Sequence, residues 1–163
     1  AVQHLFKKGN RKIGLVSAIH NIDVGRLRIE GYREAITELG LQAYVATDEE
    51  VTGLRDKIDG LYEAGVQGVI CTDIVSTLLA SRVAFENNIK IPGDLKIIGY
   101  VNEDLAPFLA PSLSYINQHP RRIGETAINF LYDRINPKER NVAPKKEILK
   151  TDMVHLDSTR FEK

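Results

Sequence analysis

The fold of this chain is decided by the stretch VQGVICTDIVSTLLASRVAFENNIKIPGDLKIIGY, which covers residues 66–100. It begins with Val66 to Cys71, an apolar run of strand length, and continues with a full helix over Ser76 to Glu86. A turn at Pro92-Gly93 separates that helix from a second apolar run, Leu95 to Ile98. Strand, helix and strand at such short spacing are typical of a βαβ unit in a parallel sheet.

The same alternation extends from this unit toward the N-terminus. Helical periodicity is present in Ala1 to Gly9, in Leu27 to Leu39 and in Thr52 to Ala64, with short apolar runs between these segments. The predicted fold class is α/β, a three-layer αβα arrangement with a mainly parallel sheet and helices on both faces. Its strands are expected near Ile13–Val16, Ala43–Ala46, Val69–Cys71 and Lys96–Gly99.

After Tyr100 the pattern changes. Residues 102–111 include two prolines and predict a loop with a helical turn. A short strand over Leu113 to Asn117 and a long amphipathic helix over Pro120 to Ile135 are expected next. A polar connector then leads to a final extended segment, Glu147 to Leu156.

Composition narrows the class of protein. The 163 residues correspond to one domain at about 150 residues per domain. The 22 Lys and Arg balance the 22 Asp and Glu, which argues against binding of nucleic acid through bulk basicity. The single cysteine, Cys71, excludes a disulfide framework. Apolar runs are far short of the ~18 residues of a membrane span, and Ala1 to Gly9 has no signal-peptide pattern, so we expect a soluble, cytoplasmic domain.

Motifs for catalysis are missing from the sequence. There is no GxSxG, HExxH or phosphate-cradling GxxxxGK[ST] pattern, and the four histidines are dispersed at positions 4, 20, 119 and 155. The first strand ends in Ser17-Ala18 without the acidic pair of an aspartyl phosphoacceptor. Cys71 ends an apolar strand and is expected to be a core residue. We therefore expect no enzyme activity, no cofactor and no metal site.

Polar residues instead follow the predicted strands, at the edge where open α/β sheets bind ligands. The candidate binding residues are Arg28, Thr72, Asp73, Tyr100 to Asn102, and Gln118. Two alternatives stay open, because Asp73 could simply cap the helix at Ser76 and Arg28 could be a solvated helix charge. Together these residues favour a crevice for a small polar ligand such as a sugar or a nucleobase.

Five blocks of the sequence resemble, in order, segments of the LacI/GalR (lactose-repressor/galactose-repressor) family of transcriptional regulators. The blocks are residues 1–13, Arg28 to Ala35, Ile91 to Tyr100, Pro111 to Gln118, and Ile123-Gly124. The resemblance implies a type I periplasmic-binding-protein-like lobe from an effector-binding domain, without the helix-turn-helix and most of the first lobe. It assigns about 17–118 to the second lobe, 1–16 and about 119–145 to pieces of the first, and about 146–163 to a C-terminal strand and tail.

The resemblance also suggests roles for the candidate residues. Arg28 matches the family arginine that holds ligand hydroxyls or carboxylates through its planar donor fork. Thr72-Asp73 matches an Asn-Asp pair at the head of a helix, and Gln118 closes the fourth block. Val101 stands where many members have an aspartate that accepts two sugar hydroxyls. A valine accepts no hydrogen bond, so either Asn102 substitutes for it or the ligand differs.

The function implied is that of the ligand-sensing and dimerisation region of a bacterial sugar-responsive transcriptional regulator. A sugar or related polar metabolite would bind between the lobes, and operator DNA would be bound only through the absent N-terminal domain. The alternative is an extracytoplasmic solute receptor of the same fold, which the residues preceding Ala1 would distinguish. An enzyme with an unrecognised site is a weaker alternative.

A homodimer is expected on the same grounds. The predicted contact uses the helix Ser76 to Glu86 and the segment after Tyr100. Apolar residues spread round that helix, so they cannot all point into one core, and a residual apolar face is typical of an interface. The residues expected to be exposed are Leu78, Leu79, Val83 and Phe85.

Overall fold

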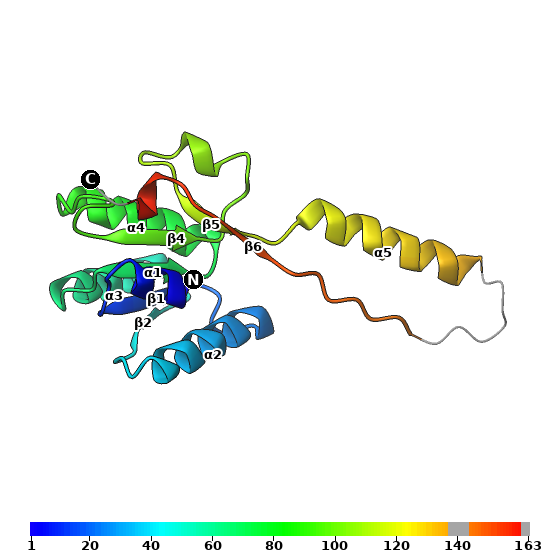
Figure 1. The fold of residues 1–163 in the computed structure, drawn as a ribbon, viewed down its shortest axis with the longest axis horizontal. Helices are drawn as coiled ribbons and strands as arrows, with labels where there is room; N and C mark the ends of the chain where they lie inside the picture. The colour runs from blue at the N-terminus through cyan, green and yellow to red at the C-terminus, as the bar shows by residue number, and fades with distance from the viewer. Residues whose placement is uncertain (137–143, 161–163) are drawn as a thin grey trace.

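The computed structural model describes residues 1–136 and 144–160, and it contains one six-stranded sheet (Figure 1). The strand order is β2-β1-β3-β4-β5-β6. The strands are β1 (Ile13–Ser17), β2 (Tyr44–Thr47), β3 (Gly68–Cys71), β4 (Lys96–Gly99), β5 (Ser114–Asn117) and β6 (Asp152–Val154). All neighbouring pairs from β2 to β5 are parallel, and only β6 runs antiparallel, against β5. The predicted mainly parallel sheet is confirmed.

Helices cover both faces of the sheet. One face packs against α1 (Val2–Lys7) and α2 (Asp23–Glu38), and the other against α3 (Val51–Glu63) and α4 (Ile74–Glu86). Alternate residues of β1 therefore serve different cores: Leu15 packs on the α1 and α2 side, and Val16 on the α3 and α4 side. The αβα layering is confirmed.

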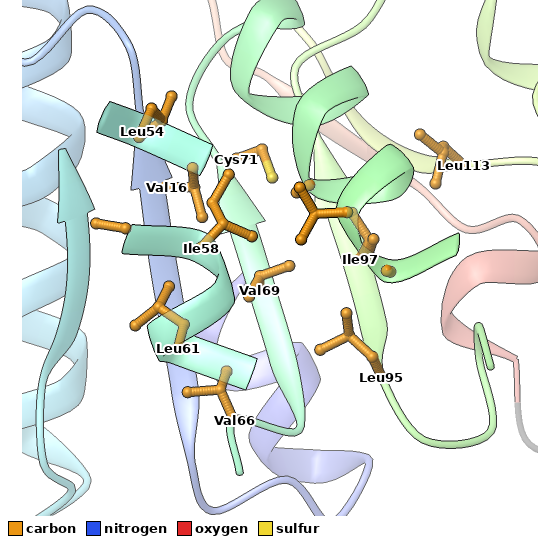
Figure 2. Packing of buried hydrophobic residues seen from close by; sticks show 14 residues of the cluster. Val16, Leu54, Ile58, Leu61, Val66, Val69, Cys71, Leu95, Ile97 and Leu113 are labelled. Carbon is orange, nitrogen blue, oxygen red and sulfur yellow. The ribbon is translucent and has the colours of Figure 1, made fainter. Parts of the chain in front are cut away.

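The larger core lies under α3 and α4 (Figure 2). Leu54, Ile58 and Leu61 of α3 recur at helical spacing and are buried against Val69 of the sheet. Cys71 is fully buried in the same cluster, and this burial raises the pKa of its thiol. The expected core position of Cys71 is confirmed, and its thiol is held in the unreactive, protonated form.

Helix α2 is packed unusually closely at its first turn. Gly25 is buried, and a Cβ added there would lie 1.8 Å from the carbonyl oxygen of Ile19. Only glycine therefore allows the loop after β1 to lie directly against α2. This contact fixes the helix one turn before Arg28.

Two expectations are corrected by the packing. Residues 1–16 were assigned to the first lobe, but β1 lies between β2 and β3, and Val2 and Leu5 of α1 belong to the same core as Tyr32. These residues are therefore part of the sheet-containing body. In α4, Val83 is fully buried and Leu79 packs on the core, whereas Leu78 and Phe85 are exposed as expected.

One helix leaves this body. After β5 the chain enters α5 (Pro120–Ile135), which extends away from the sheet, and it returns as β6 beside β5 (Figure 1). No residue of α5 is buried. Short 3-10 turns at Ala106–Phe108 and Asp157–Thr159 complete the described elements. Within residues 1–136 and 144–160, no helix has the length and apolar character needed to cross a membrane.

Candidate functional site

The candidate site lies at the carboxyl edge of the parallel strands. Ser17 ends β1, Thr72 follows β3, Tyr100 follows β4 and Gln118 follows β5. Because these strands are parallel, their ends meet at one edge of the sheet. Arg28, in the second turn of α2, reaches across this edge.

Arg28 holds three of these strand ends together. Its Nη1 donates to the backbone oxygen of Thr72, and its Nη2 donates to Gln118 Oε1 at 2.6 Å. Its guanidinium carbon lies 3.8 Å from the centroid of the Tyr100 ring, within the range of a cation–π contact. Arg28 is therefore a positioned, half-buried cation, and the alternative of a freely solvated helix charge is wrong.

Thr72 and Asp73 lie beside Arg28, at the end of β3. Thr72 is fully buried, and its hydroxyl donates to Ser17 Oγ at 2.7 Å. Asp73 caps α4: its Oδ1 accepts from Ser76 N at 2.8 Å, and its Oδ2 accepts from Ala18 N at 3.0 Å. The helix-cap interpretation of Asp73 is thus correct. Its carboxylate also fastens the loop after β1 to the head of α4.

Asn102 is not brought into this cluster. It is exposed, and its backbone oxygen accepts from Leu105 N and Ala106 N in a turn. Within the described residues, its side chain makes no hydrogen bond to Arg28 or Thr72. Val101 is buried in a small apolar cluster that includes Tyr115, so the segment after β4 offers no side-chain acceptor at that position.

A cavity of about 440 Å³ opens beside Arg28, between α1, α2 and the sheet. Thr72 and Tyr100 line it at the strand ends, and its remaining wall is mostly apolar, with Leu15, Val24, Leu27, Tyr32, Ala35 and Ile70. A few polar groups on a largely apolar concave wall are typical of small-molecule sites. Among the residues described, no cluster of three or more His, Cys, Asp or Glu with metal-binding geometry is present.

Tyr100 and Ser17 are the site residues that sequence reasoning undervalued. Tyr100 was noted only as part of a polar strand end, and Ser17 only as the end of a strand without acids. An aromatic residue directly after the Gly99 that ends β4 was the available signal for Tyr100. Its contact with Arg28 joins residues 72 positions apart, which no local pattern reveals.

Known proteins share this architecture. The family described as periplasmic binding protein-like domain matches residues 2–159. The HTH-type transcriptional repressor PurR of Photobacterium profundum is 30% identical over 153 residues, which cover 85% of this chain and 43% of that protein. The chain thus spans less than half the length of this curated relative.

Solved structures agree with this result. A LacI family transcriptional regulator from Enterococcus faecium with bound ribose has a TM-score of 0.81 at 25% identity, covering 96% of this chain and 59% of that chain. A probable maltose operon transcriptional repressor from Staphylococcus has a TM-score of 0.87 at 20% identity, covering 99% and 58%. At 20% identity the second likeness concerns the fold alone.

The fold is that of a periplasmic-binding-protein-like domain, and the chain belongs to this family. Its relatives further identify it with the effector-binding region of LacI/GalR transcriptional regulators. The resemblance and the fold class expected from the sequence are confirmed. The matched relatives are regulators rather than enzymes, and they give less support to the alternative of a solute receptor.

Proposed function

We propose that this chain is the ligand-sensing and dimerisation region of a bacterial sugar-responsive transcriptional regulator that works in the cytoplasm. The observation that carries the proposal is the anchored Arg28 at the ligand edge of the sheet, beside a cavity. A relative, PurR of Photobacterium profundum, is a transcriptional repressor, and a LacI family transcriptional regulator of this fold is described with bound ribose. Operator DNA would be bound by a helix-turn-helix outside this chain.

In this proposal the chain supplies one wall of an effector cleft between two lobes. The wall consists of Arg28, Thr72 and Gln118, with Asp73 acting through the loop that it fastens, and Asn102 would reach the ligand only from the exposed turn after β4. Gln118 accepts a hydrogen bond from Arg28 and lies two residues before α5, so a ligand at Arg28 would lie beside the segment that leaves the body. A second lobe closing on the ligand would change the spacing of the DNA-binding domains and thereby operator affinity.

The proposed partner of α5 is the first lobe. Ile123, Ile128, Leu131 and Ile135 of this helix are between 49% and 68% exposed, which is costly for large apolar side chains without a covering surface. We assign about 119–145 to that lobe, and about 146–163 to the returning strand and tail. Residues 137–143 and 161–163 lie outside the described residues.

The proposed dimer contact lies on α4 and the loop after β4. Ile74, Val75 and Leu78 of α4 are about two-fifths exposed, and Phe108 of the loop is 86% exposed. We expect sedimentation of the intact regulator, at roughly tens of micromolar, to give a dimer, because a stable interface holds the two copies together. A monomer in that range would contradict this part of the proposal.

Arg28 provides the direct test of the proposed site. Arg28→Lys keeps the charge but loses the planar fork, so we expect effector binding to the intact regulator to weaken by at least about tenfold, or ~1.4 kcal/mol. Arg28→Ala should weaken it more. A thermal-shift screen of sugars, sugar phosphates and nucleobases would identify the effector, and titration calorimetry would measure its affinity.

The matched control is Arg33→Lys, an exposed arginine on the same helix. It should leave effector affinity unchanged. Binding by Arg28→Ala that is as tight as in the parent would show that the effector site lies elsewhere.

A further inference from the structure

The cavity beside Arg28 carries an unbalanced positive charge. Arg28 is the one charged side chain among the described residues that line it, and no carboxylate lies in its wall. The rest of the wall is apolar, as at Leu15 and Ile70, or uncharged and polar, as at Gln3 and Thr72. Such a wall raises the local concentration of small anions.

Arg28 also lacks an acidic partner, unlike most arginines of the body. Within residues 1–136 and 144–160, no ion pair includes Arg28. Carboxylates pair with other arginines in Arg26–Asp23, Arg55–Glu86, Arg82–Glu86 and Arg160–Asp157. The partners of Arg28 are a backbone carbonyl, an amide oxygen and an aromatic ring. These neutral groups orient the guanidinium but do not neutralise it.

Asp73 has the carboxylate closest in sequence to this cluster, and that carboxylate already accepts hydrogen bonds from neighbouring residues. Asp73 accepts hydrogen bonds from Ala18 N and from Ser76 N and Oγ. Most of its acceptor capacity is therefore taken by the cap of α4 and the loop after β1. After β4, the side chain at position 101 is a buried valine, which cannot accept a hydrogen bond.

Acceptors for a neutral polyol are consequently scarce at this wall. Each sugar hydroxyl has a proton to donate, and a buried hydroxyl without an acceptor is costly. The Thr72 backbone oxygen and Gln118 Oε1 each already accept a hydrogen bond from Arg28, which leaves one lone pair on each oxygen for a ligand. A carboxylate or phosphate has no such proton to place, and it accepts charge-assisted hydrogen bonds from a guanidinium fork.

We propose that the effector of this site is an anion: a small metabolite that places a carboxylate or a phosphate on Arg28 and its carbon skeleton against the apolar wall. This inference rests on the proposed function and specifies its ligand class. Tyr100 holds the guanidinium plane from one side, and Thr72 and Gln118 fix two of its corners. Two of the five N–H donors of Arg28 are used in these bonds, and the other three are available to a ligand.

The test uses the intact regulator and matched probes. We would measure binding of glucose, gluconate and glucose 6-phosphate, of ribose and ribose 5-phosphate, and of inorganic phosphate, by thermal shift and titration calorimetry. We expect an anionic member of a set to bind at least about tenfold more tightly than its neutral counterpart, and its affinity to fall as salt is raised. The carboxylate and phosphate members distinguish the two sources of the anion.

Variants assign the effect to Arg28. Arg28→Gln should lower anion affinity by at least about tenfold, because the charge-assisted bonds between the guanidinium and the anion are lost. Arg33→Gln on the same helix should leave anion affinity unchanged. A neutral sugar that binds through Arg28 as tightly as its acid and phosphate analogues overturns the anion inference but supports the proposed sensing function.

The other outcomes are equally decisive. Failure of every anion in the panel, inorganic phosphate included, to bind through Arg28 overturns the inference. The proposed function fails separately, if no ligand of either kind binds and operator affinity responds to none of them. An anion that binds equally to the parent and to Arg28→Gln places the anion site elsewhere and overturns the inference as well.

Discussion

Helices α3 and α5 have a similar apolar periodicity but opposite surroundings. Both carry large apolar residues at helical spacing, yet Leu54 and Ile58 of α3 are fully buried whereas Leu131 and Ile135 of α5 are 59% and 68% exposed. The difference comes from the strands that each helix connects. A crossover between the parallel strands β2 and β3 must lay α3 on the sheet, but the antiparallel strands β5 and β6 impose no such crossover on α5. Periodicity thus identifies an apolar face, and topology decides what covers it.

The largest expected effect on the free energy of unfolding comes from truncating one apolar side chain in each helix. Ile58→Ala should lower the free energy of unfolding of this chain by about 3 kcal/mol, because it leaves a cavity in a closed core. Leu131→Ala should change it by less than about 0.5 kcal/mol. Urea unfolding measures both values. A loss at Leu131 comparable to that at Ile58 would mean that α5 packs on the body in solution.

The next largest effect on stability is expected from a single methyl group added to α2. Gly25→Ala should cost about 1–3 kcal/mol, because the new Cβ would overlap the Ile19 carbonyl and force the loop away from α2. Gly31→Ala, on the same helix, has nothing within 4 Å of its added Cβ and is the control. Thermal unfolding compares the two. Equal behaviour would show that the loop after β1 is free to move.

A third prediction concerns the contact between α1 and the chain that returns from α5. The His4 ring stacks on the His155 ring at 4.3 Å, and its Nε2 is buried with no hydrogen-bond partner among the described residues. Burial and, next, the neighbouring His155 lower the pKa of His4 from 6.5 to about 4. The unfolded chain therefore binds a proton at His4 between these values when the native chain does not.

Stability should accordingly fall as the pH drops from 6.5 toward 4, and it should be fully retained above 6.5. His4→Gln should reduce the slope of the unfolding free energy in this window, measured as the difference from the parent in urea at several pH values. The carboxylates that titrate in the same range are common to both proteins and cancel in that difference. An unchanged slope would place His4 in water, with an ordinary pKa.

The smallest expected effect on stability is that of a glycine-to-alanine substitution, made once in α3 and once in α5. Gly60→Ala in α3 should raise the free energy of unfolding by about 0.5–1 kcal/mol, because alanine favours helix and its Cβ meets nothing within 4 Å. Gly124→Ala in α5 has the same open surroundings, but it should leave global unfolding unchanged. A gain at Gly124 equal to that at Gly60 would show that the two helices unfold together.

Most of the sheet could be predicted from the sequence, because apolar runs such as Val69–Cys71 alternate with helices at βαβ spacing. The failures have physical causes. Helix α4 is apolar on most sides, so its sequence does not reveal that Ala80, Val83 and Ala84 face the sheet while Leu78 does not. The lobe assignment of residues 1–16 followed a resemblance, whereas the central place of β1 depends on strand pairing with β2 and β3.

The sequence predicted which residues belong to the site better than it predicted the contacts between them. Strand ends pointed to Thr72, Tyr100 and Gln118, because parallel topology gathers them at one edge. What the sequence did not reveal is that Arg28 lies over Tyr100, or that the Asp73 carboxylate also accepts a hydrogen bond from Ala18 N in the loop after β1. Both facts depend on side-chain geometry across distant segments.

The antiparallel pairing of β5 and β6 has one more consequence, for how such a domain could be re-engineered. Asn117 faces Asp152 in the register, so the chain leaves the body and re-enters it at neighbouring positions of one ladder. In topological terms, everything between them is an insertion into a β-hairpin. Replacing that insertion by a two-residue Asn-Gly turn would close the hairpin with the shortest favoured connection. The result would be a minimal single-lobe protein with the strand order unchanged, in which Arg28 keeps Thr72 and Tyr100 as partners but loses Gln118.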